Sequence, residues 1–282
     1  TLQRSTLIEF LKEKLPSNLI QFNKKIKHFV YESKIIKLEF ENGFSDEFDY
    51  LIISDGVFSL TKSLVINKYI QPKFFDSIAL RGTINKEHLE SIDYNNISLF
   101  LGSDLHCVVY PVDKANEFNF IGILKKNLTK NQLDDYSLFN NKNFISSILK
   151  EFSYQVQLNI LDNIKNIKCF PIYTSNKIYN EKYKNIFLIG DAFFAFPPSF
   201  AQGGSYSIET AFELSKFLYQ NIKDFKSKRK ERAQMINRRS KFNYFAFHIS
   251  NPFMILIRNF IMSRLVKNKK FLENYLGKIY KN

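Results

Sequence analysis

Residues 185–204 read NIFLIGDAFFAFPPSFAQGG and carry the strongest signal in the chain. The stretch opens with an apolar run that ends at Gly190-Asp191, passes through two prolines and closes on Gly203-Gly204. An apolar run of this length is typical of a strand buried in a sheet, and the glycine pair precedes a predicted helix at about 205–221. The segment is therefore predicted as strand, loop and helix.

The same segment has the features of a ligand site. Open α/β sheets bind ligands at the carboxyl ends of their strands, which is where Asp191 falls. Its carboxylate accepts hydrogen bonds from sugar-like hydroxyls, while Gly190 permits a close approach and Pro197 stiffens the loop. Gly203 and Gly204 leave bare backbone amides at the start of a helix, which favours nearby negative charge. On shape alone, a strand, loop and capped helix without a ligand is the alternative.

A second motif lies at residues 49–62, DYLIISDGVFSLTK. The apolar run at residues 50–53 predicts a short strand that is buried on both faces. Asp55-Gly56 follows the run, and Ser59 and Lys62 come next. Alone, the motif is also the sequence of a common Asp-Gly turn.

Together the two motifs resemble those of the FAD-dependent aromatic hydroxylases, the p-hydroxybenzoate hydroxylase-like flavoprotein monooxygenases. Strand-Gly-Asp-Ala, then Pro and Gln-Gly-Gly before a helix, is similar to the family's second flavin-binding motif. Asp-Gly-x-x-Ser with a following basic residue is similar to the family's other internal motif. The resemblance implies that Asp55 in this motif binds the cofactor. The resemblance implies that Asp191 binds the ribityl chain of FAD. It also implies that Gln202, Gly203 and Gly204 face the flavin ring, where backbone amides stabilise the anionic reduced flavin.

Weaker matches lie elsewhere in the chain. Arg4 stands three residues before Leu7, as in the family's helix start, where an arginine reaches the cofactor; an exposed basic residue is the alternative. Central strands resemble the family's substrate-domain sheet, where His106 and Tyr110 would face the substrate; packed or exposed strand positions are the alternative. The strands predicted in this region are 77–84, 97–101, 107–112, 118–124 and 168–174.

Three further elements follow from local patterns. Leu7, Phe10, Leu11 and Leu15 lie at helical spacing and predict a first helix. Alternation at residues 34–41, followed by Asn42-Gly43, predicts a hairpin. A helix is predicted at 139–152, and the basic C-terminal region is predicted to be helical with a break near Asn251-Pro252.

Several positions depart from the family pattern. The Gly-x-Gly-x-x-Gly fingerprint that cradles the FAD pyrophosphate does not occur in the sequence, and we expect it upstream of Thr1. Phe193-Phe194 replace the usual Ala-His, and Lys62 replaces an arginine. These departures leave open a catalytically inactive flavin-fold subunit that serves in binding or assembly.

Charge and cysteine content limit the kinds of partner and the compartment that the sequence predicts. The 282 residues carry 41 basic and 27 acidic side chains, a formal charge of +14. The basic residues are spread along the chain with no arginine-rich arm and no zinc-ligand spacing, so neither nucleic acid nor a metal is predicted. Two cysteines provide no disulfide framework, which favours a reducing, cytoplasmic compartment. Basic helices around apolar residues 253–257 leave open contact with the inner face of a membrane, or a basic peripheral membrane protein.

The sequence as a whole predicts an α/β (α+β) protein. We expect a partial Rossmann-like FAD-binding domain, an inserted, mainly antiparallel substrate domain and a C-terminal helical segment, with boundaries at 1–65, 66–180 and 181–282. The resemblance implies an FAD-dependent monooxygenase that uses NADH or NADPH and O2 to hydroxylate an aromatic or quinone-precursor ring. Catalytic side chains stay open, because the cofactor carries out the chemistry.

Overall fold

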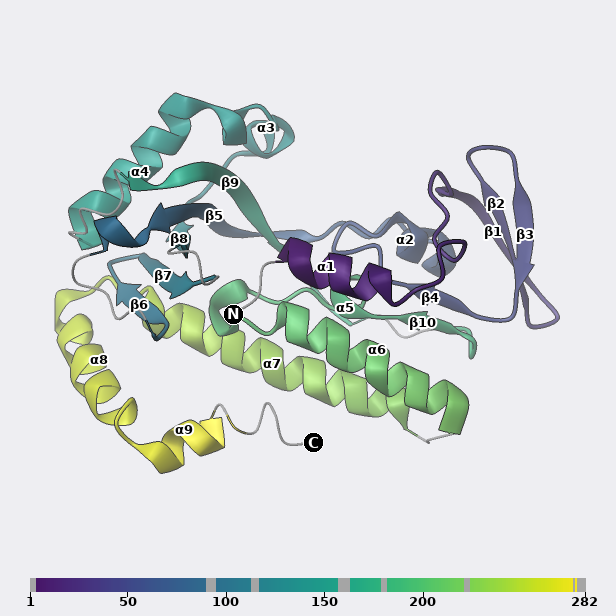
Figure 1. The fold of residues 1–282 in the computed structure, drawn as a ribbon. Helices are drawn as coiled ribbons and strands as arrows, with labels where there is room; N and C mark the ends of the chain where they lie inside the picture. The colour runs from purple at the N-terminus through teal and green to yellow at the C-terminus, as the bar shows by residue number, and fades with distance from the viewer. Residues whose placement is uncertain are drawn as a thin grey trace. The chain divides into compact units, whose positions relative to one another are not determined.

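The computed structural model describes residues 4–89, 95–112, 117–156, 163–178, 182–220, 224–275 and 277. The chain divides into two compact units (Figure 1). Unit 1 combines Thr1–Ser77 with Pro171–Asn243, and unit 2 combines Ile78–Phe170 with Tyr244–Asn282. Mixed helix and strand with a largely antiparallel second sheet is the predicted fold class, and it is confirmed.

The predicted functional domains are a different division of the chain and stay a prediction. The boundary at 65/66 falls inside unit 1, and the boundary at 180/181 lies outside the described residues. The prediction grouped the C-terminal helices with the return of the FAD-binding domain, whereas the structure assigns Tyr244–Asn282 to unit 2.

Unit 1 is built around two short parallel strands. β4 (Leu51–Ile53) pairs with β10 (Ile186–Leu188), and Ile53 lies opposite Leu188. α2 (Leu60–Ile66) follows β4; α5 (Gly190–Phe193) and α6 (Gly203–Gln220) follow β10. The strand and helix predicted from residues 185–204 are therefore confirmed.

The prediction that the 50–53 strand is buried on both faces was wrong. Ile53 is buried, but Tyr50 and Ile52 are exposed. β4 pairs with β10 on one edge, and no other described strand pairs with it. The apolar run therefore indicated the strand correctly but did not indicate whether both of its faces are buried.

Unit 1 also holds a three-stranded antiparallel sheet. β1 (Ile26–Glu32), β2 (Ile35–Phe40) and β3 (Ser45–Phe48) lie in chain order. The predicted hairpin is confirmed, and Gly43 adopts the left-handed φ of 84° that its turn requires. α1 (Arg4–Glu13) is the predicted first helix, and none of its residues is buried.

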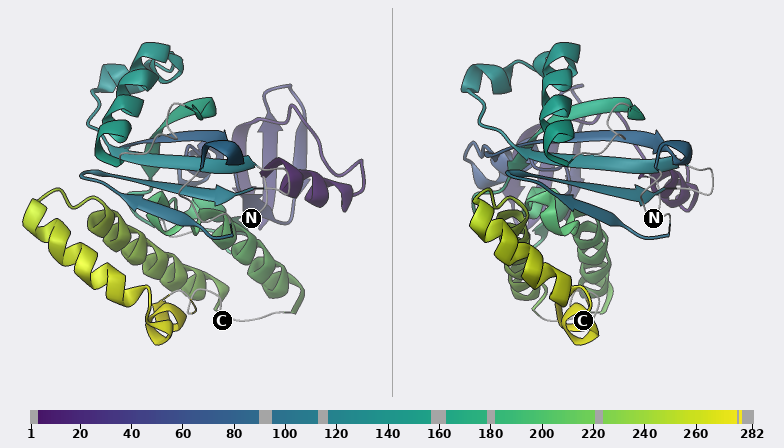
Figure 2. Two further views of the ribbon diagram at one scale, coloured as in Figure 1. Left: turned by 60° about the vertical axis from the view of Figure 1, so that its left-hand side comes forward. Right: turned by 90° about the vertical axis from the view of Figure 1, so that its left-hand side faces the viewer.

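Unit 2 is organised by a five-stranded sheet in the order β6-β7-β8-β5-β9 (Figure 2). The predicted strands are confirmed, with bounds β5 (Lys73–Asn85), β6 (Ser98–Leu101), β7 (Leu105–Pro111), β8 (Glu117–Lys125) and β9 (Lys165–Thr174). α4 (Lys142–Val156) packs on this sheet, and its Phe152 ring meets Phe120 edge to face at 6.3 Å. Gly122 makes this contact possible, because a Cβ there would lie 2.8 Å from the Phe152 ring.

The same core encloses Cys107 and Cys169. Both thiols are free and buried, and burial raises the pKa of each to about 12. Short helical segments complete the described chain: η1 (Lys86–His88), α3 (Lys130–Asp134), η2 (Leu138–Asn140) and η4 (Pro198–Phe200).

The C-terminal region is helical, as predicted. α7 (Phe225–Phe247), α8 (Pro252–Leu265) and α9 (Lys269–Tyr275) follow one another. The predicted break is confirmed, because Asn251 caps α8 by accepting the Met254 amide at 3.1 Å and Pro252 is its first residue. In the part of the chain that the structure describes, no helix is both long and apolar enough to cross a bilayer.

Candidate functional site

The two sequence motifs leave the same edge of the parallel strand pair. Because β4 and β10 run in parallel with Ile53 opposite Leu188, their carboxyl ends lie together. Asp55 follows β4 and Asp191 follows β10 within three residues of each strand end. The geometry is the one at which open α/β sheets bind ligands.

Gly190 lets two elements touch at this edge. Its φ is +56°, and an added Cβ would lie 2.8 Å from Ser207 Oγ. Ser207 Oγ in turn donates to the Gly203 carbonyl at 2.9 Å. Glycine is therefore required both by backbone conformation and by close packing, and it fixes the start of α5 against the first turn of α6.

Asp191 is exposed to solvent, yet the protein beside it removes part of the water from around its carboxyl group. This partial burial raises the pKa of Asp191, and the positive charge of Arg4 opposes the rise. The structure thus brings Arg4, from the first turn of α1, close enough to Asp191 for the two charges to interact.

The two glycines at the corner of residues 202–204 have free space beside them. The Gln202 side chain is buried, and its backbone carbonyl accepts the Tyr206 amide at 2.8 Å. Among the described residues, no hydrogen bond from the amides of Gly203, Gly204 or Ser205 is found. An added Cβ at Gly203 or Gly204 would meet no atom within 4 Å, and neither glycine has a positive φ. The protein's own packing therefore does not require these glycines, whereas a ligand against the bare amides would.

The loop that leads to this corner is held by buried residues. Pro197, with φ of −56°, is buried, and Ala201 turns the chain with φ of 51°. Phe193 and Phe194, the departure from the family pattern, are both buried. They are accordingly part of the packing beneath the loop.

Lys62 links the two motifs, and its role was not predicted. Its side chain is 3% exposed, and Nζ donates to the Ala192 carbonyl at 3.0 Å. Burial lowers the pKa of Lys62, while the charge of Asp55 opposes that effect. Ser59 caps the helix by accepting the Lys62 amide at 2.9 Å. The motif spacing identified Lys62, but its partner 130 positions away could not be read from the sequence.

Asp55 is partly engaged by its own turn. Its Oδ2 accepts the Thr61 amide at 3.3 Å, and Gly56 has φ of 86°. Asp55 also lines an open pocket of about 220 Å³ beside β4. None of the other described residues predicted to hold the cofactor lines this pocket. The other members of this lining are Ile26, Leu51, Ile52, Ile53, Ser54 and Thr61.

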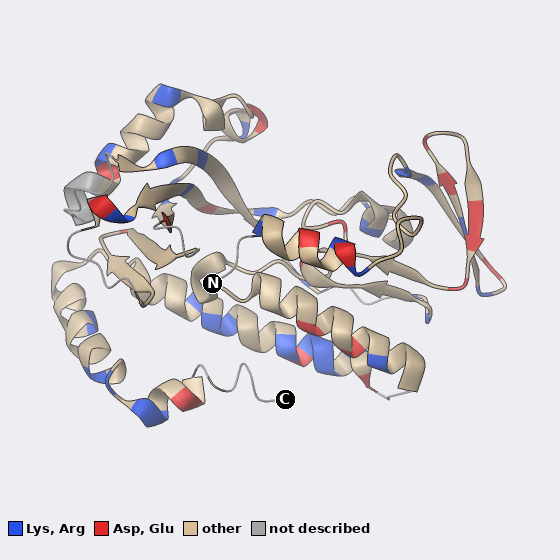
Figure 3. Cartoon of the chain, in the orientation of Figure 1, with Lys and Arg blue, Asp and Glu red and all other residues tan. Residues whose placement is uncertain are grey.

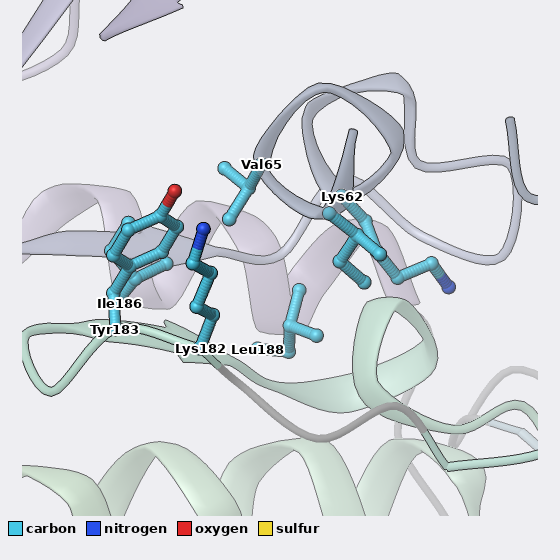
Figure 4. Close-up of a pocket in the computed structure, with 7 residues that line it drawn as sticks. Lys62, Val65, Lys182, Tyr183, Ile186 and Leu188 are labelled. Atoms are coloured by element: carbon cyan, nitrogen blue, oxygen red, sulfur yellow. The ribbon is translucent and has the colours of Figure 1, made fainter. Parts of the chain in front are cut away.

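A second, mainly apolar pocket lies between α2 and β10 (Figure 4). It has a volume of about 70 Å³, which is room for a few water molecules. Figure 4 shows the Lys62 ammonium directed away from Lys182 and Tyr183, so the two lysines do not converge. None of the predicted cofactor residues is in its lining.

Glu209 anchors the back of α6. Its two carboxylate oxygens accept from Arg229 Nη1 at 2.6 Å and from Arg232 Nη2 at 2.9 Å. All three side chains are largely shielded from solvent. This network fixes α6, and with it the direction of the amides at its start.

The two predicted substrate residues lie in unit 2 and have different surroundings. His106 is enclosed, with Nδ1 3.1 Å from His248 Nε2. Tyr110 is half-buried, and its hydroxyl accepts from Asn119 Nδ2 at 2.6 Å. The structure therefore gives His106 a packed position, while Tyr110 keeps some exposure.

Sequence relatives point to one kind of enzyme. No protein-family model matches the sequence. The 6-hydroxynicotinate 3-monooxygenase of Bordetella bronchiseptica is 23% identical over 264 residues, covering 89% of this chain and 67% of the relative. The salicylate hydroxylase of Pseudomonas putida is 25% identical over 134 residues, covering 43% of this chain and 31% of the relative.

Solved structures agree on the fold. A salicylate hydroxylase substrate complex matches with a TM-score of 0.77 at 17% identity, covering 99% of this chain and 73% of that chain. HpxO of Klebsiella pneumoniae, complexed with FAD and uric acid, matches with a TM-score of 0.72 at 15% identity, covering 98% and 70%. The chain is a homologue of the FAD-dependent aromatic hydroxylases.

The homology covers part of the relatives. This chain spans about two thirds of the Bordetella enzyme and 54% of Monooxygenase 2 of Arabidopsis thaliana, to which it is 24% identical over 237 residues. The resemblance inferred from the two motifs is thereby confirmed at the level of family. The assignment of individual cofactor residues stays a prediction.

Proposed function

We propose that this chain belongs to an FAD-dependent monooxygenase that hydroxylates a small aromatic or quinone-precursor ring with NADH or NADPH and O2. The observation that carries the proposal is the open corner at Gly203-Gly204, whose bare amides lie at the start of α6. The hydroxylase relatives support the same class of reaction.

The residues at this corner fit a flavin. When bound, FAD would supply the redox chemistry, taking electrons from NADH or NADPH and using them to activate O2. The free amides of Gly203 and Gly204 would stabilise negative charge on the ring, and Asp191 would accept hydrogen bonds from the ribityl hydroxyls. Arg4 would add positive charge beside Asp191. Gln202 and Pro197 would hold the loop in place, and Lys62 would fix α5 relative to α2.

The chain's share of the reaction is positioning. Hydroxylation needs the ring held close to the flavin in a water-poor pocket, and no nucleophilic side chain is required. Of the two residues predicted to face the substrate, Tyr110 is the more accessible. The two free cysteines support a cytoplasmic compartment. The dispersed basic residues support a small aromatic substrate over nucleic acid as the partner.

Asp191→Asn tests the cofactor role. The variant keeps the side-chain shape but loses the charge, and hydrogen bonds to a charged acceptor contribute about 1.5–3 kcal/mol. We therefore expect FAD to bind roughly tenfold to a hundredfold more weakly, measured by flavin absorbance and fluorescence titration of the protein made from its complete reading frame. Asp46→Asn, at an exposed position in β3, is the matched control. Unchanged FAD affinity in Asp191→Asn would remove Asp191 from this role.

Gly204→Leu tests the corner itself. A Cβ at position 204 would meet no protein atom within 4 Å, and leucine replaces the poorest non-proline helix former, so the thermal midpoint should hold or rise. It would, however, occupy the space assigned to the flavin, and FAD retention should be lost. A variant that folds and still binds FAD as tightly as the wild type would contradict the proposal.

A catalytically inactive flavin-fold subunit is the second candidate. Phe193-Phe194 in place of the usual pair favours it, because the family's histidine is absent at that position. The distinguishing measurement is NADH or NADPH oxidation by the FAD-loaded protein across a panel of hydroxylated aromatic acids. Flavin binding without ring-stimulated oxidation would favour the inactive subunit.

A further inference from the structure

One side of α8 exposes a run of large apolar side chains. Phe253, Leu256, Ile257, Phe260 and Ile261 follow the spacing i, i+3, i+4, i+7 and i+8, which normally marks the face that a helix buries. Each of these side chains is between 38% and 70% exposed. A contiguous exposed apolar face of this kind marks an interaction surface. We call these five residues the α8 stripe.

The opposite side of α8 fixes its orientation within unit 2. Arg258 is the buried residue of this helix, and it points away from the α8 stripe by its position on the helical wheel. Its Nη1 donates to the Phe247 carbonyl at 3.4 Å, at the end of α7. Burial lowers the pKa of Arg258. With the Asn251 cap, this contact holds the α8 stripe outward.

The charged side chains of the chain segment that holds the α8 stripe have one sign. Between Tyr244 and Leu272 the sequence contains no aspartate or glutamate. Arg264 lies over the Phe260 ring at 5.1 Å, at the end of the stripe, and Lys267, Lys269 and Lys270 follow directly. Figure 3 shows this basic group along the end of α8 and the start of α9. Exposed apolar side chains and nearby exposed cations both favour binding to an anionic membrane surface.

We propose that α8 docks in the plane of a membrane surface that carries anionic lipids. The 14 residues of α8 extend about 21 Å, less than the roughly 30 Å of a bilayer core, so the helix would lie along the surface. The stripe would enter the headgroup boundary, and Arg264 and the three lysines would meet the lipid phosphates.

Charge also favours lipid over a second copy of the chain. Isologous association through the α8 stripe would bring two sets of like charges to one rim, with Glu273 as the nearest acid in sequence. An anionic lipid surface complements the same residues. The proposal is independent of the monooxygenase activity, since it rests on α8 alone.

Vesicle sedimentation tests the docking. The protein from its complete reading frame is mixed with phosphatidylcholine vesicles, with or without an equal amount of phosphatidylglycerol. We expect binding to the anionic vesicles that falls as salt is raised. Phe253→Ser with Phe260→Ser should weaken this binding at least tenfold, because two apolar side chains no longer enter the boundary. Phe22→Ser with Phe44→Ser, two exposed aromatics of unit 1, is the matched control.

The basic residues are tested separately. Each lysine near an anionic surface contributes about 1 kcal/mol, or roughly fivefold in binding. Lys267→Gln, Lys269→Gln and Lys270→Gln together should therefore weaken binding roughly a hundredfold. The control triple, Lys130→Gln, Lys142→Gln and Lys150→Gln, removes the same charge from exposed positions of α3 and α4 and should keep the wild-type affinity.

The chain's lack of tryptophan provides a direct reporter. In Phe260→Trp, the emission gained over the wild type comes from the added indole, and it should shift to the blue on anionic vesicles and resist aqueous quenchers. Three results would overturn the proposal: no vesicle binding by the wild type, equal losses in the variants and their controls, or an indole that stays in water. Concentration-dependent dimerisation that the Phe253 and Phe260 changes abolish would assign the stripe to a second copy instead.

Discussion

Two buried imidazoles make unit 2 sensitive to acid. His106 on β7 and His248 after α7 are 2% and 7% exposed, and their ring nitrogens lie 3.1 Å apart. Burial and the neighbouring His248 lower the pKa of His106 to about 3, and burial lowers the pKa of His248 to about 4. The nearby charges of Asp104 and Lys125 act on His248 in opposite directions.

The sign of the pH effect follows from proton binding. An unfolded histidine has a pKa of about 6.5, so below that pH the unfolded chain binds more protons than the folded chain. Stability is therefore complete above pH about 6.5 and is lost as the pH falls. From pH 7.5 to 5.0, each histidine costs about 2 kcal/mol, and the pair costs about 4 kcal/mol. This is a large part of the ~5–15 kcal/mol that stabilises a typical domain.

Urea unfolding at pH 7.5, 6.0 and 5.0, followed by circular dichroism, measures this cost. The matched experiment compares the wild type with a double variant that carries both His106→Gln and His248→Gln. The carboxylates also contribute to the pH dependence, but their contribution is the same in the two proteins and cancels in the comparison. We expect the variant's loss of unfolding free energy between pH 7.5 and 5.0 to be about 4 kcal/mol smaller than that of the wild type. His28→Gln, at an exposed position of β1, should keep the wild-type pH dependence.

Two results would refute the reasoning. One is the same pH dependence in the double variant and the wild type. The other is a proton NMR titration in which the ring signals of His106 and His248 move with a midpoint near 6.5 in the folded protein. Either result would mean that the pair is protonated without unfolding, and hence that the enclosed packing is not maintained in solution.

Three further predictions concern unit 1. Gly190→Ala places a methyl group 2.8 Å from Ser207 Oγ at a φ of +56°, so a loss of about 1–3 kcal/mol is expected in urea unfolding, and Ser207→Gly should restore part of it. Glu209→Gln removes the carboxylate that pairs with two largely buried arginines, and a loss of about 3–5 kcal/mol is expected in thermal or urea unfolding. Burial lowers the pKa of Lys62, so just below pH 10.5 the folded chain binds fewer protons than the unfolded chain. The free energy of unfolding should therefore rise with pH in this range. Lys62→Met should reduce the rise, whereas Lys130→Met, at an exposed position, should not.

Local pattern was sufficient for most elements of the fold. The apolar run before Gly190-Asp191 predicted β10, and alternation at residues 34–41 predicted β2 and its hairpin. These signals are local because a strand's period and a turn's φ requirement act over a few residues. β1 was not predicted, since its alternation is weak until β2 is present as a partner.

Contacts between distant positions were beyond sequence reasoning. Nothing in the sequence pairs His106 with His248, 142 positions later, so the contact between the two rings could not be predicted. The same limit hid the Lys62 contact with Ala192. The burial of a strand residue also depends on distant parts of the chain. Ile52 has the hydrophobicity of a buried strand residue, yet it is exposed, because burial depends on which elements lie above it.

Under the proposed monooxygenase function, the position of the two thiols has a chemical consequence. Reduced flavins that fail to hydroxylate a substrate release hydrogen peroxide, which attacks thiolates far faster than protonated thiols. Cys107 and Cys169 are enclosed, and their pKa of about 12 keeps them almost wholly protonated at neutral pH. We therefore expect that hydrogen peroxide from unproductive turnovers of the proposed reaction would form no sulfenic acid in this core.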